Sequence, residues 1–124
     1  MVQVRFDHVR VNVSDLVRAE RFYTDVLGMQ RIVHYESPGR GILQLGHGGR
    51  PPGVELWSEE GQVLAPRETD HVAFAVDDVP VLVERARGLG YQVHAEPWMI
   101  GDETVASVKD PDGNLIELND FVGR

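Results

Sequence analysis

The sequence contains one pattern twice, and this duplication limits what the chain can fold into. Residues 6–16 read Phe-Asp-His-Val-Arg-Val-Asn-Val-Ser-Asp-Leu, and residues 69–79 read Thr-Asp-His-Val-Ala-Phe-Ala-Val-Asp-Asp-Val. Aligning the two Asp-His pairs places His8 on His71. The repeat is too long for a solenoid unit, and a half-chain of about 60 residues buries too little core to be stable alone. The sequence therefore predicts two copies of a small motif that share a sheet system within a single domain, residues 1–124.

Each copy also ends on a shared pattern. Val54-Glu55-Leu56 in the first half aligns with Ile116-Glu117-Leu118 in the second. The halves differ at many other aligned positions, such as Asn12 and Ala75, yet they agree at both the His and the Glu. Two equivalent His and two equivalent Glu, all in strand-like sequence, form a candidate set of four metal ligands.

The first half predicts one helix and four strands. Val9, Val11 and Val13 alternate with polar residues, which is typical of a strand with one buried face. Ser14 is placed to cap the following helix and Gly28 to end it. Three strand-like runs follow the helix, over residues 29–36, 41–46 and 53–58.

The second half repeats this order. Val72 and Phe74 lie on the apolar face of a strand. Asp77 or Asp78 caps a helix that ends at Gly90. The remaining strands are predicted near residues 91–95, 103–109 and 114–119.

Each half is therefore a βαβββ module. The modules are expected at about 1–58 and 69–124, joined by residues 58–69. The predicted fold is α+β, with the two tandem modules forming a curled mixed sheet around a metal-binding cavity. Because side chains alternate across a strand, His8 and His71 face away from the apolar side of their strands and toward this cavity.

The candidate ligands define the chemistry of the cavity. The chain has no cysteine, so thiolate ligation is impossible. Neutral imidazole and carboxylate suit Ni, Zn, Co, Mn or Fe, and one divalent metal ion is expected per site. Four protein ligands on an octahedral ion leave two positions for neighbouring oxygens of a small-molecule substrate. A Glu that leaves the ion can then move a proton between adjacent carbons.

Charge and hydropathy exclude other classes of partner. The formal net charge of −8 argues against nucleic acid, whose binding relies on basic patches. No apolar run approaches the ~20 residues that span a bilayer, so no membrane is expected. The first residues lack the long apolar region of a secretory signal, so the expected location is cytoplasmic.

With these motifs in view, the chain resembles the vicinal oxygen chelate superfamily, which includes glyoxalase I, bleomycin-binding proteins and extradiol dioxygenases. The resemblance covers essentially the whole chain. It rests on five segments: residues 7–9, 22–29, 54–56, 70–74 and 110–118.

A His-Glu-His-Glu set resembles the ligands of glyoxalase I, or lactoylglutathione lyase. The resemblance implies an enzyme, a metal-dependent lyase or isomerase, and a homodimer with sites at or near the interface. It makes Glu117 or Glu55 the catalytic, proton-shuttling base. It assigns the metal to four residues: His8, Glu55, His71 and Glu117.

The sequence also departs from glyoxalase I. Those enzymes commonly carry an Arg four residues after the first His, where this chain has Asn12, although Arg10 lies on the same face and can take its place. A Lys expected before the seventh strand is absent from the run Trp98-Met99-Ile100-Gly101. We therefore expect a less charged, more apolar substrate. Its binding residues would be Arg10, Asn12, Trp57, Trp98 and Met99.

Two other functions stay open at this point. One is a metal-free small-molecule binding or antibiotic-resistance protein, in which the duplicated ligands have no metal role. The other is a superfamily enzyme of different chemistry, such as an epimerase, dioxygenase or thiol transferase. His34, His47 and His94 have no counterparts in the other half and are expected to be surface or structural residues.

Overall fold

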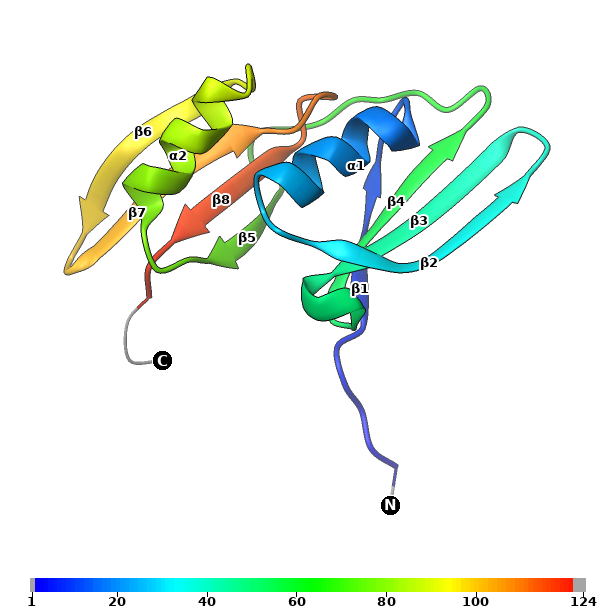
Figure 1. Ribbon diagram of the computed structural model, residues 1–124, viewed down its shortest axis with the longest axis horizontal. Coiled ribbons are helices and arrows are strands. Elements are labelled where there is room, and N and C mark those ends of the chain that lie inside the picture. The colour runs from blue at the N-terminus through cyan, green and yellow to red at the C-terminus, as the bar shows by residue number, and fades with distance from the viewer. Residues whose placement is uncertain (1, 122–124) are drawn as a thin grey trace. The chain divides into compact units, whose positions relative to one another are not determined.

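The computed structural model describes residues 2–121, which divide into two compact units, one ending at Leu64 and the other beginning at Ala65. The boundary lies inside the segment predicted to join the modules. Each unit has the element order βαβββ (Figure 1). The predicted α+β fold of two such modules is therefore confirmed, and the strands form one four-stranded mixed sheet in each module.

The first module begins with strand β1, which pairs in parallel with the last strand of the module, and its sheet order is β1-β4-β3-β2. Its helix packs against β3 and β4 (Figure 1). A short 3-10 turn, η1 (His47–Gly49), lies between β3 and β4. The other elements are β1 (His8–Asn12), α1 (Leu16–Asp25), β2 (Gln30–Ser37), β3 (Arg40–Gly46) and β4 (Gly53–Glu59).

The second module repeats this topology, with the sheet order β5-β8-β7-β6 and a parallel pair of β5 and β8. Its helix packs against β6 and β7. The elements are β5 (His71–Ala75), α2 (Val79–Gly88), β6 (Val93–Ile100), β7 (Glu103–Lys109) and β8 (Leu115–Asn119).

The core of each module lies between its helix and its sheet. In the first, Phe22 and Tyr23 of α1 are fully buried, with ring centroids 5.0 Å apart in an edge-to-face arrangement. Leu56 of β4 is also fully buried. In the second, Ala86 of α2 and Ile116 of β8 are fully buried. Because this packing uses one face of the first and last strands, the alternate residues lie on the other face.

The N-cap predicted for the first helix was wrong by one residue. Asp15 caps α1, because its carboxylate accepts a hydrogen bond from the backbone N–H of Arg18 at 2.9 Å. Ser14 lies outside the helix, and its carbonyl oxygen accepts a hydrogen bond from the Ser58 hydroxyl. In α2 the capping residue is Asp78, one of the two that the sequence indicated.

Strand β6 is longer than predicted. The sequence prediction ended it near residue 95, but it continues to Ile100 past Pro97. The pairing with β7 shifts between Ala95 and Trp98, which accommodates the proline. Since β6 is an edge strand, a missing backbone donor is tolerated there. Trp98 and Met99 therefore lie on a strand rather than in a loop.

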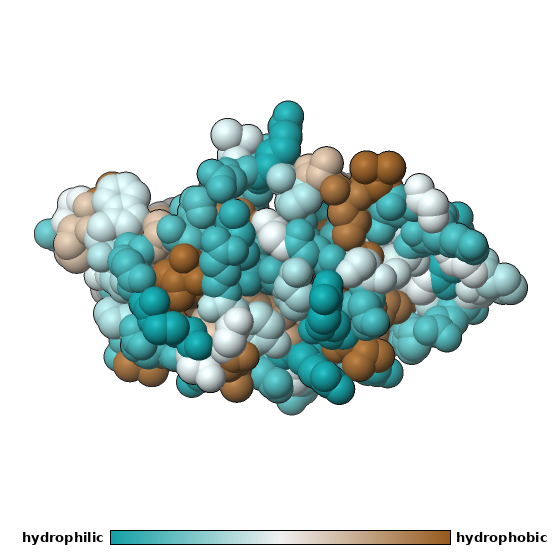
Figure 2. Space-filling model, turned by 90° about the horizontal axis from the view of Figure 1, so that it is seen from above, coloured by the Kyte–Doolittle hydropathy of each residue, from teal (hydrophilic) through white to brown (hydrophobic). Residues whose placement is uncertain are grey.

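The face shown in Figure 2 is largely hydrophilic, with hydrophobic side chains in several separate groups. Neither α1 nor α2, the two α-helices among residues 2–121, has the length and apolar character that crossing a bilayer requires. The cytoplasmic location stays a prediction from the sequence.

Candidate metal centre

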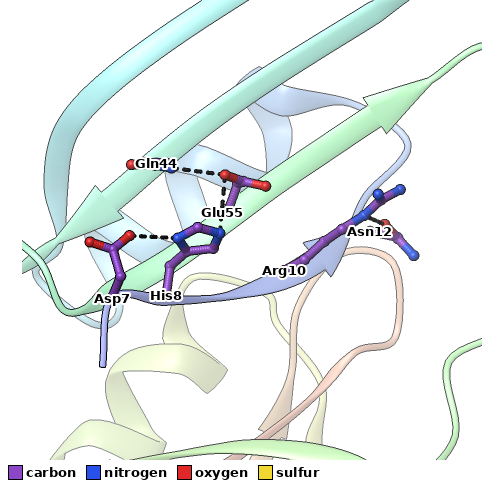
Figure 3. A network of polar contacts seen from close by, with 6 residues as sticks. All are labelled: Asp7, His8, Arg10, Asn12, Gln44 and Glu55. Carbon is purple, nitrogen blue, oxygen red and sulfur yellow. Dashed lines mark hydrogen bonds and ion pairs between the residues drawn. The ribbon is translucent and has the colours of Figure 1, made fainter. Parts of the chain in front are cut away.

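The first candidate ligand pair lies on the neighbouring strands β1 and β4. The Nε2 atom of His8 is 3.3 Å from Oε2 of Glu55, and the Glu55 side chain is only 12% exposed. Gln44, opposite Glu55 on β3, donates a hydrogen bond from Nε2 to the same carboxylate oxygen at 2.8 Å (Figure 3). The parallel pairing of β1 with β4 thus brings together two residues that are far apart in the sequence.

The other nitrogen of His8 is held by the preceding residue. Nδ1 of His8 is 2.6 Å from Oδ2 of Asp7, and Figure 3 shows the imidazole between the Asp7 and Glu55 carboxylates. A carboxylate on Nδ1 favours the tautomer with its proton there, which leaves the Nε2 lone pair available to bind a metal ion. Second carboxylates of this kind commonly orient metal-ligating histidines.

The second candidate pair lies on the corresponding strands β5 and β8. Nε2 of His71 is 3.8 Å from Oε1 of Glu117, whose side chain is 28% exposed. The buried amide of Asn119 donates from Nδ2 to the other carboxylate oxygen of Glu117 at 3.1 Å. The module therefore repeats the ligand pair of the first, although the pair is wider and more exposed.

The aspartate before His71 has a different partner. Asp70 accepts two hydrogen bonds from Arg67, at 2.9 and 3.1 Å. The Arg67 guanidinium holds the pKa of the Asp70 carboxyl below its usual range. In this arrangement Asp70 is bound to a cation, whereas Asp7 is bound to its histidine.

The separation of the first pair suits two ligands of one divalent ion. Ligand atoms about 2.1 Å from an ion lie about 3.0 Å apart at a right angle and about 3.4 Å apart at a tetrahedral angle. The His8–Glu55 separation falls in this interval, and the His71–Glu117 separation is slightly wider. Among residues 2–121, no three His, Asp or Glu side chains form a group that could hold an ion, and each module brings together one pair of candidate ligands, which we call a half-site.

Three residues that orient the ligand pairs were not assigned a role from the sequence: Asp7, Gln44 and Asn119. The signal for Asp7 was present, because an aspartate precedes the histidine in both halves. Gln44 contacts Glu55 through the register of β3 and β4, and such a register cannot be read from a single strand's pattern.

The predicted substrate-binding residues of the first module form a cluster on one face of the sheet. The guanidinium carbon of Arg10 lies 4.0 Å from the centre of the Trp57 ring, and Arg10 Nε donates to Asn12 Oδ1 at 2.7 Å. Arg40 approaches the same ring, at 5.4 Å. The Trp57 ring therefore contacts two guanidinium groups and is not a purely apolar surface.

Trp98 and Met99, the predicted walls from the second module, lie on the edge strand β6. Their exposures are 53% and 57%, and the Thr104 hydroxyl is 3.4 Å from the Met99 sulfur.

The other histidines have local contacts. Nε2 of His47 lies 2.8 Å from the carbonyl oxygen of Leu27, which ties η1 to the turn that follows α1.

Both modules present a His from the first strand and a Glu from the last strand on one face of a mixed sheet. This arrangement defines a class of proteins built from paired βαβββ modules with a candidate metal half-site in each. Residues 5–118 match the Glyoxalase/Bleomycin resistance protein/Dioxygenase superfamily, and the chain belongs to this family.

The chain is similar to named enzymes of the family. It is 33% identical over 122 residues to a probable lactoylglutathione lyase of Vibrio parahaemolyticus, and the match covers 92% of this chain and 88% of that protein. It is 37% identical over 122 residues to the lactoylglutathione lyase of Arabidopsis thaliana, which it matches over 92% of its own length and only 43% of that protein's length.

A solved structure agrees with these relatives. The trypanothione-dependent glyoxalase I of Leishmania major superimposes with a TM-score of 0.80 at 30% identity, over 95% of this chain and 87% of that chain. The predicted resemblance to glyoxalase I enzymes is therefore confirmed.

Proposed function

We propose that this protein is a metal-dependent lyase or isomerase of the glyoxalase I type. The observation that carries the proposal is the repeated His–Glu pair on the first and last strands of both modules, with separations of 3.3 Å in the first module and 3.8 Å in the second. The similarity to lactoylglutathione lyases supports it. One divalent ion would be held by four ligands: His8, Glu55, His71 and Glu117.

The proposed reaction moves a proton between adjacent carbons of a small substrate. His8, Glu55, His71 and Glu117 would hold a divalent ion, which would supply stabilisation of the negative charge that develops on the substrate oxygens. The carboxylate of Glu117 or Glu55 takes the proton from one carbon and returns it to the next. Asn119 and Gln44 hold these two carboxylates in place by the hydrogen bonds described above.

We further propose that each centre combines the half-site of one chain with the other half-site of a second chain in a symmetric homodimer. Each module supplies two ligands, and both pairs are partly exposed, so each half-site needs a second pair to complete four-fold ligation. A two-fold symmetric dimer pairs them twice and gives two equivalent centres.

The proposal is tested by metal content and turnover. Elemental analysis of the purified protein should find about one divalent ion per chain, because a dimer with two centres serves two chains. The loaded protein should isomerise the hemithioacetal of methylglyoxal and glutathione, or of methylglyoxal and a simpler thiol. A metal-free protein that takes up a planar aromatic ligand would support the binding-protein alternative, and iron-dependent oxygen uptake would support the dioxygenase alternative.

Complementation tests where the half-sites meet. Glu55→Gln and Glu117→Gln variants are each expected to be inactive. When they are mixed and allowed to exchange subunits, half of the dimers contain one of each, and one of their two centres has only native ligands. About a quarter of the native activity should then return if the centres span two chains. If each centre lies within one chain, mixing restores nothing.

A further inference from the structure

An apolar arm, residues 2–6, precedes β1. Val2, Val4 and Phe6 are 87%, 89% and 68% exposed, and no strand within residues 2–121 pairs with this segment. Figure 1 shows the arm running on from β1 and away from its own module. Large apolar side chains at every second position are typical of a strand with one buried face. The arm has this pattern without a surface that covers it.

The arm leads directly into the first half-site. The backbone N–H of Gly53 donates to the carbonyl oxygen of Asp7 at 3.0 Å, so the module holds the chain from Asp7 onward. Because side chains alternate along an extended chain, Phe6 and Val4 lie on the same side as His8. A surface that binds the arm therefore also fixes the backbone on the N-terminal side of the contact between Asp7 and His8.

The second module offers a free sheet edge, β5. This strand pairs only with β8 and lies at the end of its sheet. It reads His-Val-Ala-Phe-Ala and contains no acid, no Lys or Arg and no proline, the residues that usually protect edge strands from pairing. Ala73 and Ala75 are exposed and leave space on the ligand face. A second extended segment can therefore pair with β5 without a charge or a bulky side chain obstructing that face.

The charges of the two modules favour contact between a first module and a second module. Residues 1–64 contain eight acids and seven arginines, a net charge of −1, whereas residues 65–124 contain twelve acids and five bases, a net charge of −7. Two second modules in contact would therefore repel each other. The arm adds one positive charge, Arg5, which suits the more acidic module.

A centre that spans two chains brings the arm and β5 together. His8 is the first residue of β1 and His71 is the first residue of β5, and both strands are sheet edges. If His8 and the partner's His71 bind one ion, β1 of one chain lies beside β5 of the other. A local two-fold axis that relates the equivalent ligands, and keeps both ligand faces toward the ion, makes these two strands antiparallel. The arm, which precedes His8, then runs along β5 of the second chain.

We propose that the arm pairs with β5 of a second copy of this chain, so that Phe6 lies beside the partner's Ala73 and Val4 beside the partner's Ala75. The position of the arm rests on the proposed function, because the shared ion sets which strands are neighbours. Large apolar side chains then cover small ones, and two unpaired backbone edges pair with each other. The two exchanged arms stabilise the dimer, and each arm fixes the approach of its own His8 to the centre.

Cross-linking tests where the arm binds. The photoreactive residue p-benzoylphenylalanine replaces Phe6, and this chain exchanges subunits with about a tenfold excess of isotope-labelled, heavier native chain before irradiation. Mass spectrometry then separates links between chains from links within one chain. The expected product joins the light arm to the heavy peptide that contains residues 71–75. A link within the light chain, or a link to another part of the heavy chain, would overturn the proposal.

Single substitutions measure what the arm contributes to the dimer. Phe6→Asp and Val4→Asp should each raise the dissociation constant of the dimer by about 10-fold or more, as expected when one buried apolar side chain is lost. Val63→Asp is the matched control, because Val63 is 86% exposed but lies in the segment that joins the modules, and it should leave the constant unchanged. Analytical ultracentrifugation over a dilution series measures the constants, and far-ultraviolet circular dichroism checks that the variants are folded. An unchanged constant in both arm variants would contradict the proposal.

Metal titration separates failure of this proposal from failure of the proposed function. Phe6→Asp should lower the affinity for Ni²⁺ by about 10-fold or more, because the free arm no longer fixes His8 at a shared centre. If the cross-link to residues 71–75 forms but native protein binds no divalent ion, the arm binds as proposed and the proposed function is wrong. If native protein binds the ion and isomerises its substrate, but no such cross-link forms and Phe6→Asp dimerises as native protein does, the arm proposal is wrong and the proposed function stands.

Discussion

The two half-sites use the same ligand types but support them differently. In the first module, His8 is bonded to Asp7, and the Glu55 carboxylate is nearly enclosed. In the second, Asp70 is bound to Arg67, and the pair of His71 and Glu117 is wider and more exposed. The two halves therefore share the candidate ligands but differ in the residues that surround them. We infer that the first half-site is arranged before an ion binds and that the second adjusts to it.

The largest expected effect comes from removing a ligand in either half. Glu55→Gln and Glu117→Gln each replace a charged ligand with a weak neutral one. Each should reduce activity by a factor on the order of 100 or more and reduce metal occupancy with it. Glu36→Gln, at an exposed acid of β2, is the matched control and should change neither. Elemental analysis and kcat/KM measurements test this, and full metal occupancy in Glu117→Gln would contradict the ligand role.

The next largest effect concerns the aspartates that precede the two histidines. Substituting Asp7 should lower metal affinity more than substituting Asp70. Asp7→Asn removes the carboxylate that orients His8, and the loss of such a group typically lowers metal affinity by about 10- to 100-fold. Asp70→Asn should lower it much less, because that carboxylate is bonded to Arg67 rather than to His71. Metal titration of both variants measures the difference. Equal losses would mean that Asp70 leaves Arg67 and supports His71 once an ion is bound.

A smaller effect is expected from the groups that hold the two carboxylates. Asn119 is 2% exposed and donates to Glu117, so Asn119→Ala should reduce the free energy of unfolding by about 1–3 kcal/mol. Gln44 is less buried, and Gln44→Ala should cost less than that. Urea denaturation of the metal-free proteins compares them. Equal destabilisation by Gln44→Ala and Asn119→Ala would contradict the predicted difference in unfolding free energy.

The fold could be predicted from the sequence, and the candidate ligands could be selected from it, because both depend on repeated local patterns. Alternating apolar residues identified the strands, and the doubled Asp-His and hydrophobic-Glu-hydrophobic segments identified His8, Glu55, His71 and Glu117 as candidates. The support of these residues was not predictable in the same way. The contact of Gln44 with Glu55 depends on strand register. The hydrogen bonds that Asp70 accepts from Arg67 depend on the conformation of the loop before β5. The sequence prediction ended strand β6 too early. A proline such as Pro97 indicates the end of a strand unless the strand is known to lie at a sheet edge.

The smallest predicted effect concerns an ion pair in the first module that lies away from the candidate ligands. Arg31 of β2 donates two hydrogen bonds to Glu20 of α1 and lowers the pKa of that carboxyl, while partial burial opposes the shift. A carboxyl whose pKa is lower in the folded state stabilises the protein above the pKa of the unfolded state, and this stabilisation is lost as the pH falls through the lower, folded-state value. Because the Arg31 side chain is 53% exposed and solvent screens the pair, Glu20→Gln should cost less than about 1 kcal/mol at pH 7 and nothing in strong acid. Urea denaturation at both pH values tests this, and metal affinity should not change. A loss of metal affinity in Glu20→Gln would show that the half-site depends on how α1 is joined to β2, rather than on the Asp7 and Gln44 contacts alone.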